Sequence, residues 1–259
     1  MRIKQSVCYP IFSVEGMTLD ELFKTVAEIG YAAIELWGRG DDFEEVVGLA
    51  RKHGLAVASM CGHASLADGL NKRSNHDRIE DELRTSVDLA AEHHIPGIIC
   101  FSGNRQPHMS EMEAIEACAD GLKRVAPYAE EKGINLNMEL LNSKVDHAGY
   151  QCDHTAWGVA VCERVGSPRV KLLYDIYHMQ IMEGDLIRTI RENIQWIGHF
   201  HTAGNPGRHD MDDTQELNYA GICQGIADTG YDLYVGHEFS PTGDPIEALR
   251  QTFELCNRG

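Results

Sequence analysis

The 259 residues suit one large domain or two small ones, and their composition is that of an ordinary globular protein, with 43% hydrophobic and 24% charged residues. The net charge of −17 argues against a nucleic-acid partner, because phosphate binding needs a cationic surface. The chain has no apolar run of about 18 residues, as a membrane span would need, and its N-terminus lacks the apolar core of a signal peptide, so we expect a cytoplasmic protein.

Short apolar runs alternate with longer helical patterns along the chain. Thr18 followed by Glu21, and Ser110 followed by Glu113, predict capped helix starts. In chain order, we predict strand Ile3–Tyr9, helix Thr18–Gly30, strand Ala32–Trp37, helix Phe43–His53, strand Leu55–Cys61, helix Ser74–His94, strand Gly97–Phe101, helix Ser110–Lys132, strand Ile134–Leu141, helix Thr155–Val165, strand Val170–Asp175, helix Glu183–Asn193, strand Trp196–Thr202, helix Leu217–Gly230, strand Leu233–Phe239 and helix Pro245–Cys256.

This alternation predicts an α/β fold, a single (β/α)8 TIM barrel over residues 1–259. Strands alternating with helices imply a parallel sheet, and eight such units in a chain of this length imply a closed barrel. The alternative is a doubly wound open sheet with a dinucleotide site. No GxGxxG motif follows any strand, and Gly38-Arg39-Gly40 alone is weak support for that alternative.

Polar side chains follow four consecutive predicted strands. Apart from Lys171, Val170–Asp175 is apolar until its final acid, which is costly to bury there unless it is paired or binds a metal ion. Taken alone, Asp175 could equally cap the next helix. The carboxyl ends of barrel strands converge on one mouth, however, so a recurring pattern points to a site. The candidates are Glu139 and Asn142, Asp175 and His178, His199 and His201, and His237 and Glu238.

Strand alternation helps to choose among these candidates, since side chains two apart share a face. His199 and His201 should point the same way, with His201 nearer the rim. His237 and Glu238 should point in opposite directions, and we expect Glu238 to face the mouth.

Three carboxylates and one imidazole would suit Mn²⁺ or Mg²⁺ better than a structural zinc ion. The eight cysteines are scattered without a CxxC pair, which argues against a thiolate site. A metal ion here would hold a hydroxy-carbonyl substrate and acidify its carbon-bound proton. Carboxylates on either side could then remove and return that proton.

The chain resembles the xylose isomerase-like barrel superfamily over essentially its whole length, and most of all its hydroxypyruvate isomerase branch, with ketose 3-epimerases as close relatives. The segments that carry this resemblance are MELLN at 138–142, YDIYHMQ at 174–180, HFHTAGNPGR at 199–208, ELNY at 216–219 and GHEF at 236–239.

The resemblance implies one divalent ion, Mn²⁺ or Mg²⁺ with Co²⁺ or Zn²⁺ as other choices, held by Glu139, Asp175, His201 and Glu238. The two glutamates would also form the acid/base pair. His178 would contact the substrate, and Arg208 is a further candidate on the substrate side. Asn142 and His63 are additional candidates; for His63, a substrate contact and a structural hydrogen bond are equally good interpretations.

The sequence leaves the substrate open. Hydroxypyruvate isomerases usually have Gln at the third ligand position, whereas His201 is the choice of the ketose epimerases. Epimerases carry an acidic residue on the substrate side just after strand five. This chain lacks that acid and has Asn142 in the same region. We therefore expect interconversion of hydroxypyruvate and tartronate semialdehyde, with ketose 3-epimerisation as the alternative.

Two further functions are weaker alternatives. An apurinic endonuclease of this superfamily would need three metal ions, and hence extra histidines on strands two to four and an Asp-x-His after strand seven. Here Phe101 ends strand four, and the region after strand seven reads RHDMDD. A non-enzymatic sugar-binding barrel would not need a complete ligand set. The expected partner is therefore a small hydroxy-carbonyl compound or sugar, with no nucleic acid or membrane, and a homo-oligomer is left open.

Overall fold

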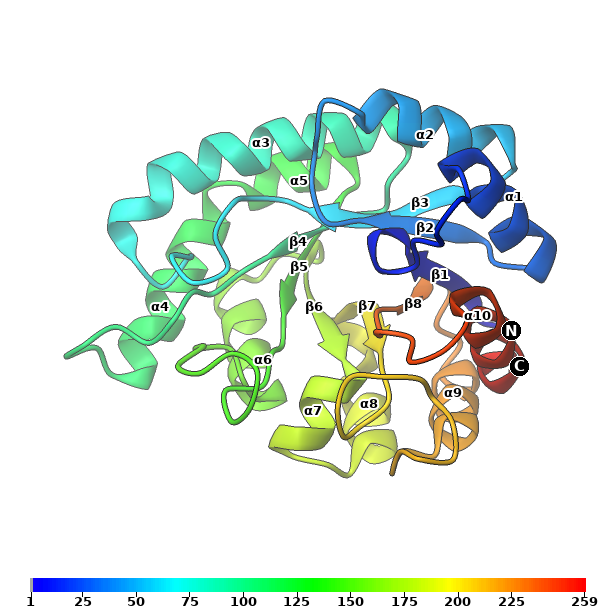
Figure 1. Ribbon diagram of the computed structural model, residues 1–259. Helices are drawn as coiled ribbons and strands as arrows, with labels where there is room; N and C mark the ends of the chain where they lie inside the picture. Colours follow the sequence, from blue (N-terminus) through cyan, green and yellow to red (C-terminus); the bar gives the residue numbers. More distant parts are fainter. Residues whose placement is uncertain (1) are drawn as a thin grey trace.

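The computed structural model describes residues 2–259, in which eight parallel strands close into a barrel (Figure 1). Each strand pairs with the next in sequence and β8 pairs with β1, which confirms the predicted fold class. The two ends of the chain lie side by side, and the Ile3 amide donates to the Arg258 carbonyl oxygen at 3.1 Å. The strands are β1 (Lys4–Cys8), β2 (Ala33–Leu36), β3 (Ala56–Cys61), β4 (Gly97–Cys100), β5 (Asn135–Glu139), β6 (Val170–Asp175), β7 (Ile197–Thr202) and β8 (Tyr234–His237).

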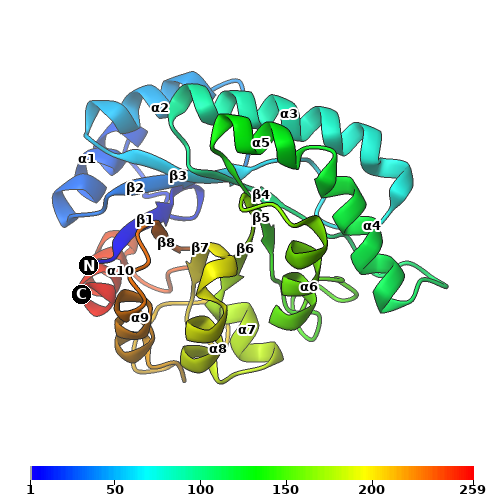
Figure 2. The same ribbon diagram turned by 180° about the vertical axis from the view of Figure 1, so that it is seen from behind.

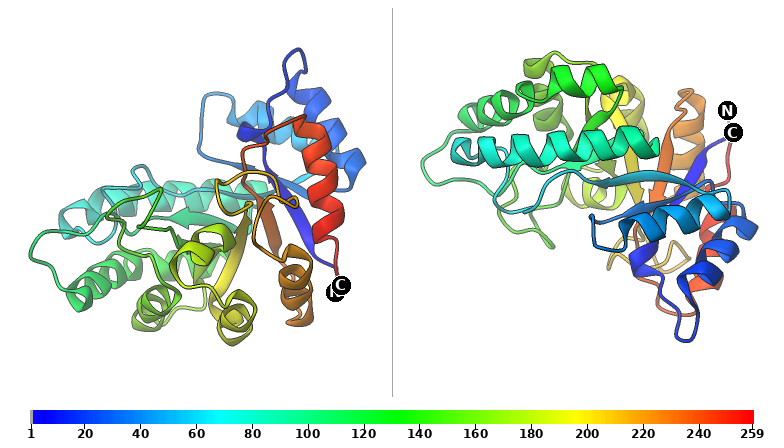
Figure 3. Two further views of the ribbon diagram at one scale, coloured as in Figure 1. Left: turned by 60° about the horizontal axis from the view of Figure 1, so that its bottom comes forward. Right: turned by 90° about the horizontal axis from the view of Figure 1, so that it is seen from above.

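Helices surround the barrel on its outside, as the opposite view and the two tilted views show (Figures 2 and 3). None of the helices in the described residues has the length and apolarity needed to cross a membrane. The helices are α1 (Leu19–Ile29), α2 (Phe43–Lys52), α3 (His76–His93), α4 (Glu111–Lys123), α5 (Ala126–Lys132), α6 (Thr155–Val165), α7 (Ile176–Met182), α8 (Leu186–Asn193), α9 (Tyr219–Asp228) and α10 (Pro245–Cys256), with the short 3-10 turns η1 (Tyr9–Ile11), η2 (Arg73–Asn75) and η3 (Ile194–Trp196).

The predicted helix starts are confirmed at both capping boxes. The Thr18 hydroxyl accepts from the Glu21 amide at the start of α1, and the Ser110 hydroxyl accepts from the Glu113 amide at the start of α4. In both, the glutamate returns a bond to the capping residue, so two amide groups that lack helical partners are satisfied.

Two predictions about helices were wrong. The single helix expected over Ser110–Lys132 is two helices, because Pro127 has no N–H to donate to the Lys123 carbonyl and its ring crowds that position. Helix α7 was not predicted at all. Asp175 starts it by accepting from the His178 amide at 3.0 Å, and the helix expected from Glu183 begins only at Leu186.

The strands that carry the candidate residues are buried along almost their whole length. This is typical of parallel strands covered on both faces, and it explains why they read as apolar runs. Lys171 is the half-buried exception in β6, and its amine donates to the Gln195 carbonyl oxygen. The register pairs Asp175 with His201 and His201 with Gly236, so the ends of β6, β7 and β8 lie at one level.

Candidate metal centre and active site

Four side chains from consecutive strands meet at the carboxyl ends of β5 to β8. Glu139 and Asp175 end β5 and β6, His201 lies near the end of β7, and Glu238 directly follows β8. All four are buried, and one ligand atom from each lies within 4.8 Å of the others. His201 Nδ1 lies 3.3 Å from Glu238 Oε2 and 3.7 Å from Glu139 Oε1. The structure therefore brings together the four residues that the sequence singled out as ligands.

The chemistry of this cluster fits a divalent cation. Three buried carboxylates repel one another unless a positive charge lies between them. His201 Nδ1 faces two of them and has no hydrogen-bond partner among residues 2–259. An unpartnered imidazole nitrogen beside converging carboxylate oxygens is the donor set of a metal site, so these four residues could hold an ion.

Glu238 has two further polar contacts at the mouth. The Arg208 guanidinium donates to Glu238 Oε2 at 2.5 Å and lies 3.9 Å from Asp175 Oδ2. The indole N–H of Trp37 donates to Glu238 Oε1 at 2.9 Å, although the Trp37 side chain is half exposed. Glu238 faces the mouth as expected, whereas His237 faces away and bonds with Gln5 and Thr202.

His178 lies beside this cluster of four side chains and is held from behind by Asn142. The side-chain amide of Asn142 donates to His178 Nδ1 and to Asp146, each at 2.6 Å. Its side-chain oxygen accepts hydrogen bonds from two backbone amides. This leaves Asn142 fully engaged, so it can act only through His178. His178 Nε2 is buried and lies 3.7 Å from Asp175 Oδ2, with no hydrogen-bond partner in the described chain.

His63 is held by the backbone on both ring nitrogens. Its Nε2 accepts from the Phe101 amide at 2.9 Å, and its Nδ1 donates to the Ala64 carbonyl oxygen at 3.0 Å. These bonds favour the structural interpretation of His63 over the substrate contact, because no nitrogen remains to bind a ligand.

The two glutamates differ in their affinity for a proton. Burial raises the pKa of Glu139, and the nearby carboxylates of Glu238 and Asp175 raise it further. Burial also acts to raise the pKa of Glu238, but His201 and Arg208 outweigh it and lower that pKa to about 2. Burial lowers the pKa of His178 well below its usual range, and the Arg208 charge acts in the same direction. One site thus holds two carboxyl groups with different protonation behaviour.

A small cavity opens next to this cluster. Its volume is about 180 Å³, which is below the ~300–1,000 Å³ of pockets for drug-sized ligands. Glu139, His201, Glu238 and Arg208 line one side. The β2–β4 side is lined by Trp37, Cys61 and Phe101, where a three-metal nuclease would place further ligands.

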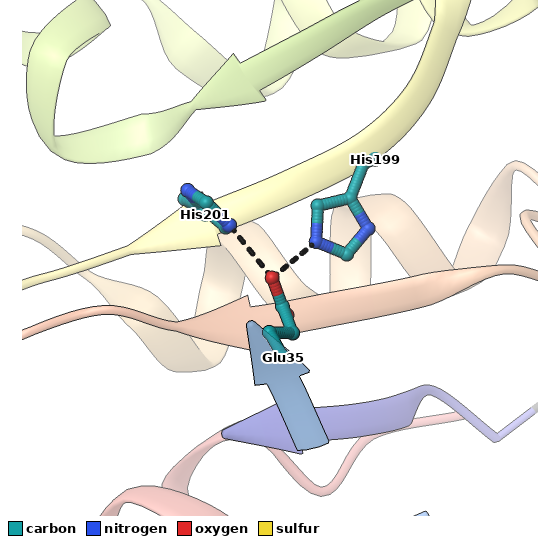
Figure 4. Close-up of side chains that lie close together, drawn as sticks. All are labelled: Glu35, His199 and His201. Atoms are coloured by element: carbon teal, nitrogen blue, oxygen red, sulfur yellow. Dashed lines mark hydrogen bonds and ion pairs between the residues drawn. The ribbon is translucent and has the colours of Figure 1, made fainter. Parts of the chain in front are cut away.

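A further buried acid, which was not among the residues expected from the sequence, lies below the four clustered side chains. Glu35 is buried in β2, and its Oε2 accepts from His199 Nε2 at 3.0 Å and from His201 Nε2 at 2.9 Å (Figure 4). His199 and His201 share a face, as predicted, but His199 contacts Glu35 rather than the mouth. The signal was an acid within the apolar strand Ala33–Leu36, where an unpaired carboxylate would be costly.

The fold and the site together define a parallel (β/α)8 barrel with an acid-rich centre at the carboxyl ends of its strands. The chain belongs to the xylose isomerase-like TIM barrel family, whose sequence model matches residues 23–258.

Two named proteins are similar to this chain in sequence. A human protein provisionally named a hydroxypyruvate isomerase is 32% identical over 232 residues, which are 85% of this chain and 83% of that protein. A 2-oxo-tetronate isomerase from Cupriavidus necator is 33% identical over 172 residues, covering 62% of this chain and 63% of that protein.

Solved structures share the same fold at lower identity. A Brucella melitensis protein described as an AP endonuclease of family 2 superimposes with a TM-score of 0.84 at 22% identity, covering 99% of this chain and 100% of that one. The D-psicose 3-epimerase of Clostridium cellulolyticum superimposes with a TM-score of 0.79 at 16% identity, covering 98% of each chain. At these identities the likeness concerns the fold alone.

Proposed function

We propose that this protein is a metal-dependent isomerase that moves a proton between adjacent carbons of a small 2-hydroxy carbonyl compound. The observation that carries the proposal is the pair Glu139 and Glu238 on the wall of one small cavity, with Arg208 beside them. The relatives named for hydroxypyruvate and 2-oxo-tetronate isomerisation support the same reaction class.

The proposed metal ligands are Glu139, Asp175, His201 and Glu238. Their oxygen-rich set favours Mn²⁺ or Mg²⁺, with Co²⁺ and Zn²⁺ as further choices. A bound divalent cation would polarise the substrate carbonyl and so supply the stabilisation that an enediolate needs.

The protein's own groups would carry the proton. One glutamate takes a proton from C3 of hydroxypyruvate, and the same or the opposite glutamate delivers one to C2, which gives tartronate semialdehyde. The hydroxyl proton moves to the former carbonyl oxygen, so atoms and charge balance. Asn142 holds His178, which is proposed to contact the substrate.

Two features of the cavity favour a short acidic substrate over a ketose. Its volume of about 180 Å³ is small. Arg208 lines it, and among residues 2–259 only Glu238 lies within hydrogen-bond distance of the guanidinium, which leaves other N–H groups to bind a carboxylate. Hydroxypyruvate and 2-oxo-tetronate carry a carboxylate and ketoses do not. Ketose 3-epimerisation remains the second candidate because His201 occupies the ligand position as in the epimerases.

We expect the purified protein, supplied with Mn²⁺, to convert hydroxypyruvate and to act far more slowly on six-carbon ketoses. Product formation from hydroxypyruvate, 2-oxo-tetronate, D-psicose and D-tagatose would be compared by NMR at equal concentrations. Arg208→Lys keeps the charge but loses the planar fork, and should raise KM for the acidic substrates more than for the ketoses. Faster turnover of a ketose than of either acid would favour the epimerase, and turnover of none would refute both.

A further inference from the structure

Glu35 lies inside the barrel beneath the proposed metal centre and does not line the open cavity, but its Oε2 accepts from His201, which does. Its side chain is buried, and both carboxylate oxygens are bonded. Oε2 accepts from His199 and His201 (Figure 4), and Oε1 accepts from the Ser6 hydroxyl at 2.5 Å. Its ion-pair partners in the described residues are these two imidazoles alone.

His201 is the point where Glu35 and the metal cluster meet. Its Nε2 lies 2.9 Å from Glu35 Oε2, while its Nδ1 lies 3.3 Å from Glu238 Oε2 on the other side of the ring. An ionised carboxylate accepts hydrogen bonds but cannot donate one. The bond between Glu35 and His201 therefore needs a proton on Nε2 of the His201 ring. With an ion in the cluster, the Nδ1 lone pair would be directed toward that ion.

The neighbouring strand is built to leave room for this contact. Gly236 of β8 pairs with His201 in the sheet register. A Cβ atom at Gly236 would lie 2.0 Å from Glu35 Oε1 and 3.0 Å from His201 Cδ2. Any larger residue at position 236 would therefore displace the carboxylate. The space that Glu35 occupies is formed by Ser6 of β1, His199 and His201 of β7, and Gly236 of β8.

We propose that Glu35 is a positioning residue that fixes the tautomer and ring orientation of His201 and thereby tunes the affinity of the metal centre. This inference rests on the proposed metal site but assigns a group outside its four ligands. A carboxylate behind a ligating imidazole holds the ring and makes it a better donor, and loss of such a partner costs about 10- to 100-fold in metal affinity or activity.

The direct test of the tautomer uses metal-free protein labelled with ¹⁵N in its histidine rings. The His201 signals are identified as those absent from His201→Gln. We expect a proton fixed on His201 Nε2 in the wild type and none fixed there in Glu35→Leu, which fills the space but accepts no hydrogen bond. A wild-type His201 that carries no proton on Nε2 would overturn the proposal whether or not any variant folds.

The second readout is Mn²⁺ affinity, measured by calorimetry at constant pH. We expect dissociation constants about 10- to 100-fold weaker in Glu35→Leu and a smaller loss in Glu35→Gln, which keeps one acceptor oxygen. The matched control is Ser59→Ala. Ser59 of β3 pairs with Glu35 of β2 in the sheet register, and both residues are buried. The Ser59 hydroxyl has no hydrogen-bond partner in the described chain, so we expect this variant to bind Mn²⁺ with wild-type affinity.

The outcomes separate this inference from the proposed function. If the wild type binds Mn²⁺ and both Glu35 variants bind it equally well, Glu35 does not position the centre, and the metal site itself stands. If the wild type binds no divalent ion, the proposed centre and this role both fail, whatever the tautomer. Two ions per wild-type chain and one in Glu35→Gln would make Glu35 a ligand of a second ion with His199 and His201, and would also overturn the proposal.

Discussion

Glu139→Gln and Glu238→Gln should each lower turnover by about 10²- to 10⁴-fold, the usual contribution of a positioned acid or base. The amide keeps the shape of the carboxylate and one ligating oxygen, so each variant should retain part of its metal, but it cannot accept the substrate proton. Turnover of hydroxypyruvate and bound Mn²⁺ would be measured on the same samples, so that loss of chemistry is separated from loss of the ion.

The matched control is Glu192→Gln, an exposed position on α8, which should keep wild-type turnover. A near-normal rate in one of the two site variants, with metal bound, would show that its glutamate is only a ligand. His178 would not take over as the base, because Asn142 donates to its Nδ1 and the proton of the neutral ring therefore lies on Nε2.

Asp175→Ala should strip the metal from the protein, because removing one of four protein ligands takes away charge and geometry together. Asp175 also starts helix α7 through its bond with the His178 amide, so the alanine variant should lose about 1 kcal/mol of stability as well. Metal content after dialysis against Mn²⁺ would be measured by elemental analysis, and stability by thermal unfolding of the metal-free protein.

Asp175→Asn separates the two roles of this residue. The amide oxygen can still accept from the His178 amide, so the metal-free variant should unfold near the wild-type temperature while its metal affinity falls. If Asp175→Ala keeps full metal occupancy, the ligand assignment is wrong and Asp175 serves only as a helix cap.

Much of the barrel could be predicted because parallel strands covered on both faces are apolar runs, and each is followed by a helix with recognisable ends. The ligand set followed from the same reasoning. Carboxyl ends of barrel strands converge, so the polar residues after β5 to β8 had to meet. Period-two alternation was enough to choose Glu238 over His237, and the structure places Glu238 at the mouth.

Other features could not be predicted because they depend on packing between distant segments. Glu35 meets His199 and His201 across the barrel interior, 164 and 166 residues away in the chain, and strand pattern alone gives no such pairing. Helix α7 is only seven residues long, too short for a clear helical period. The engagement of Asn142 with His178 depends on how the loop after β5 folds back.

Metal-dependent proton transfer at carbon is tested most directly by following hydroxypyruvate in D₂O with the Mn²⁺-loaded wild-type protein. The C3 proton signal in the NMR spectrum should fall at a rate proportional to enzyme concentration, and prior removal of metal with EDTA should abolish that rate. Isomerisation without any uptake of solvent deuterium, or exchange that is unchanged after metal removal, would contradict the account.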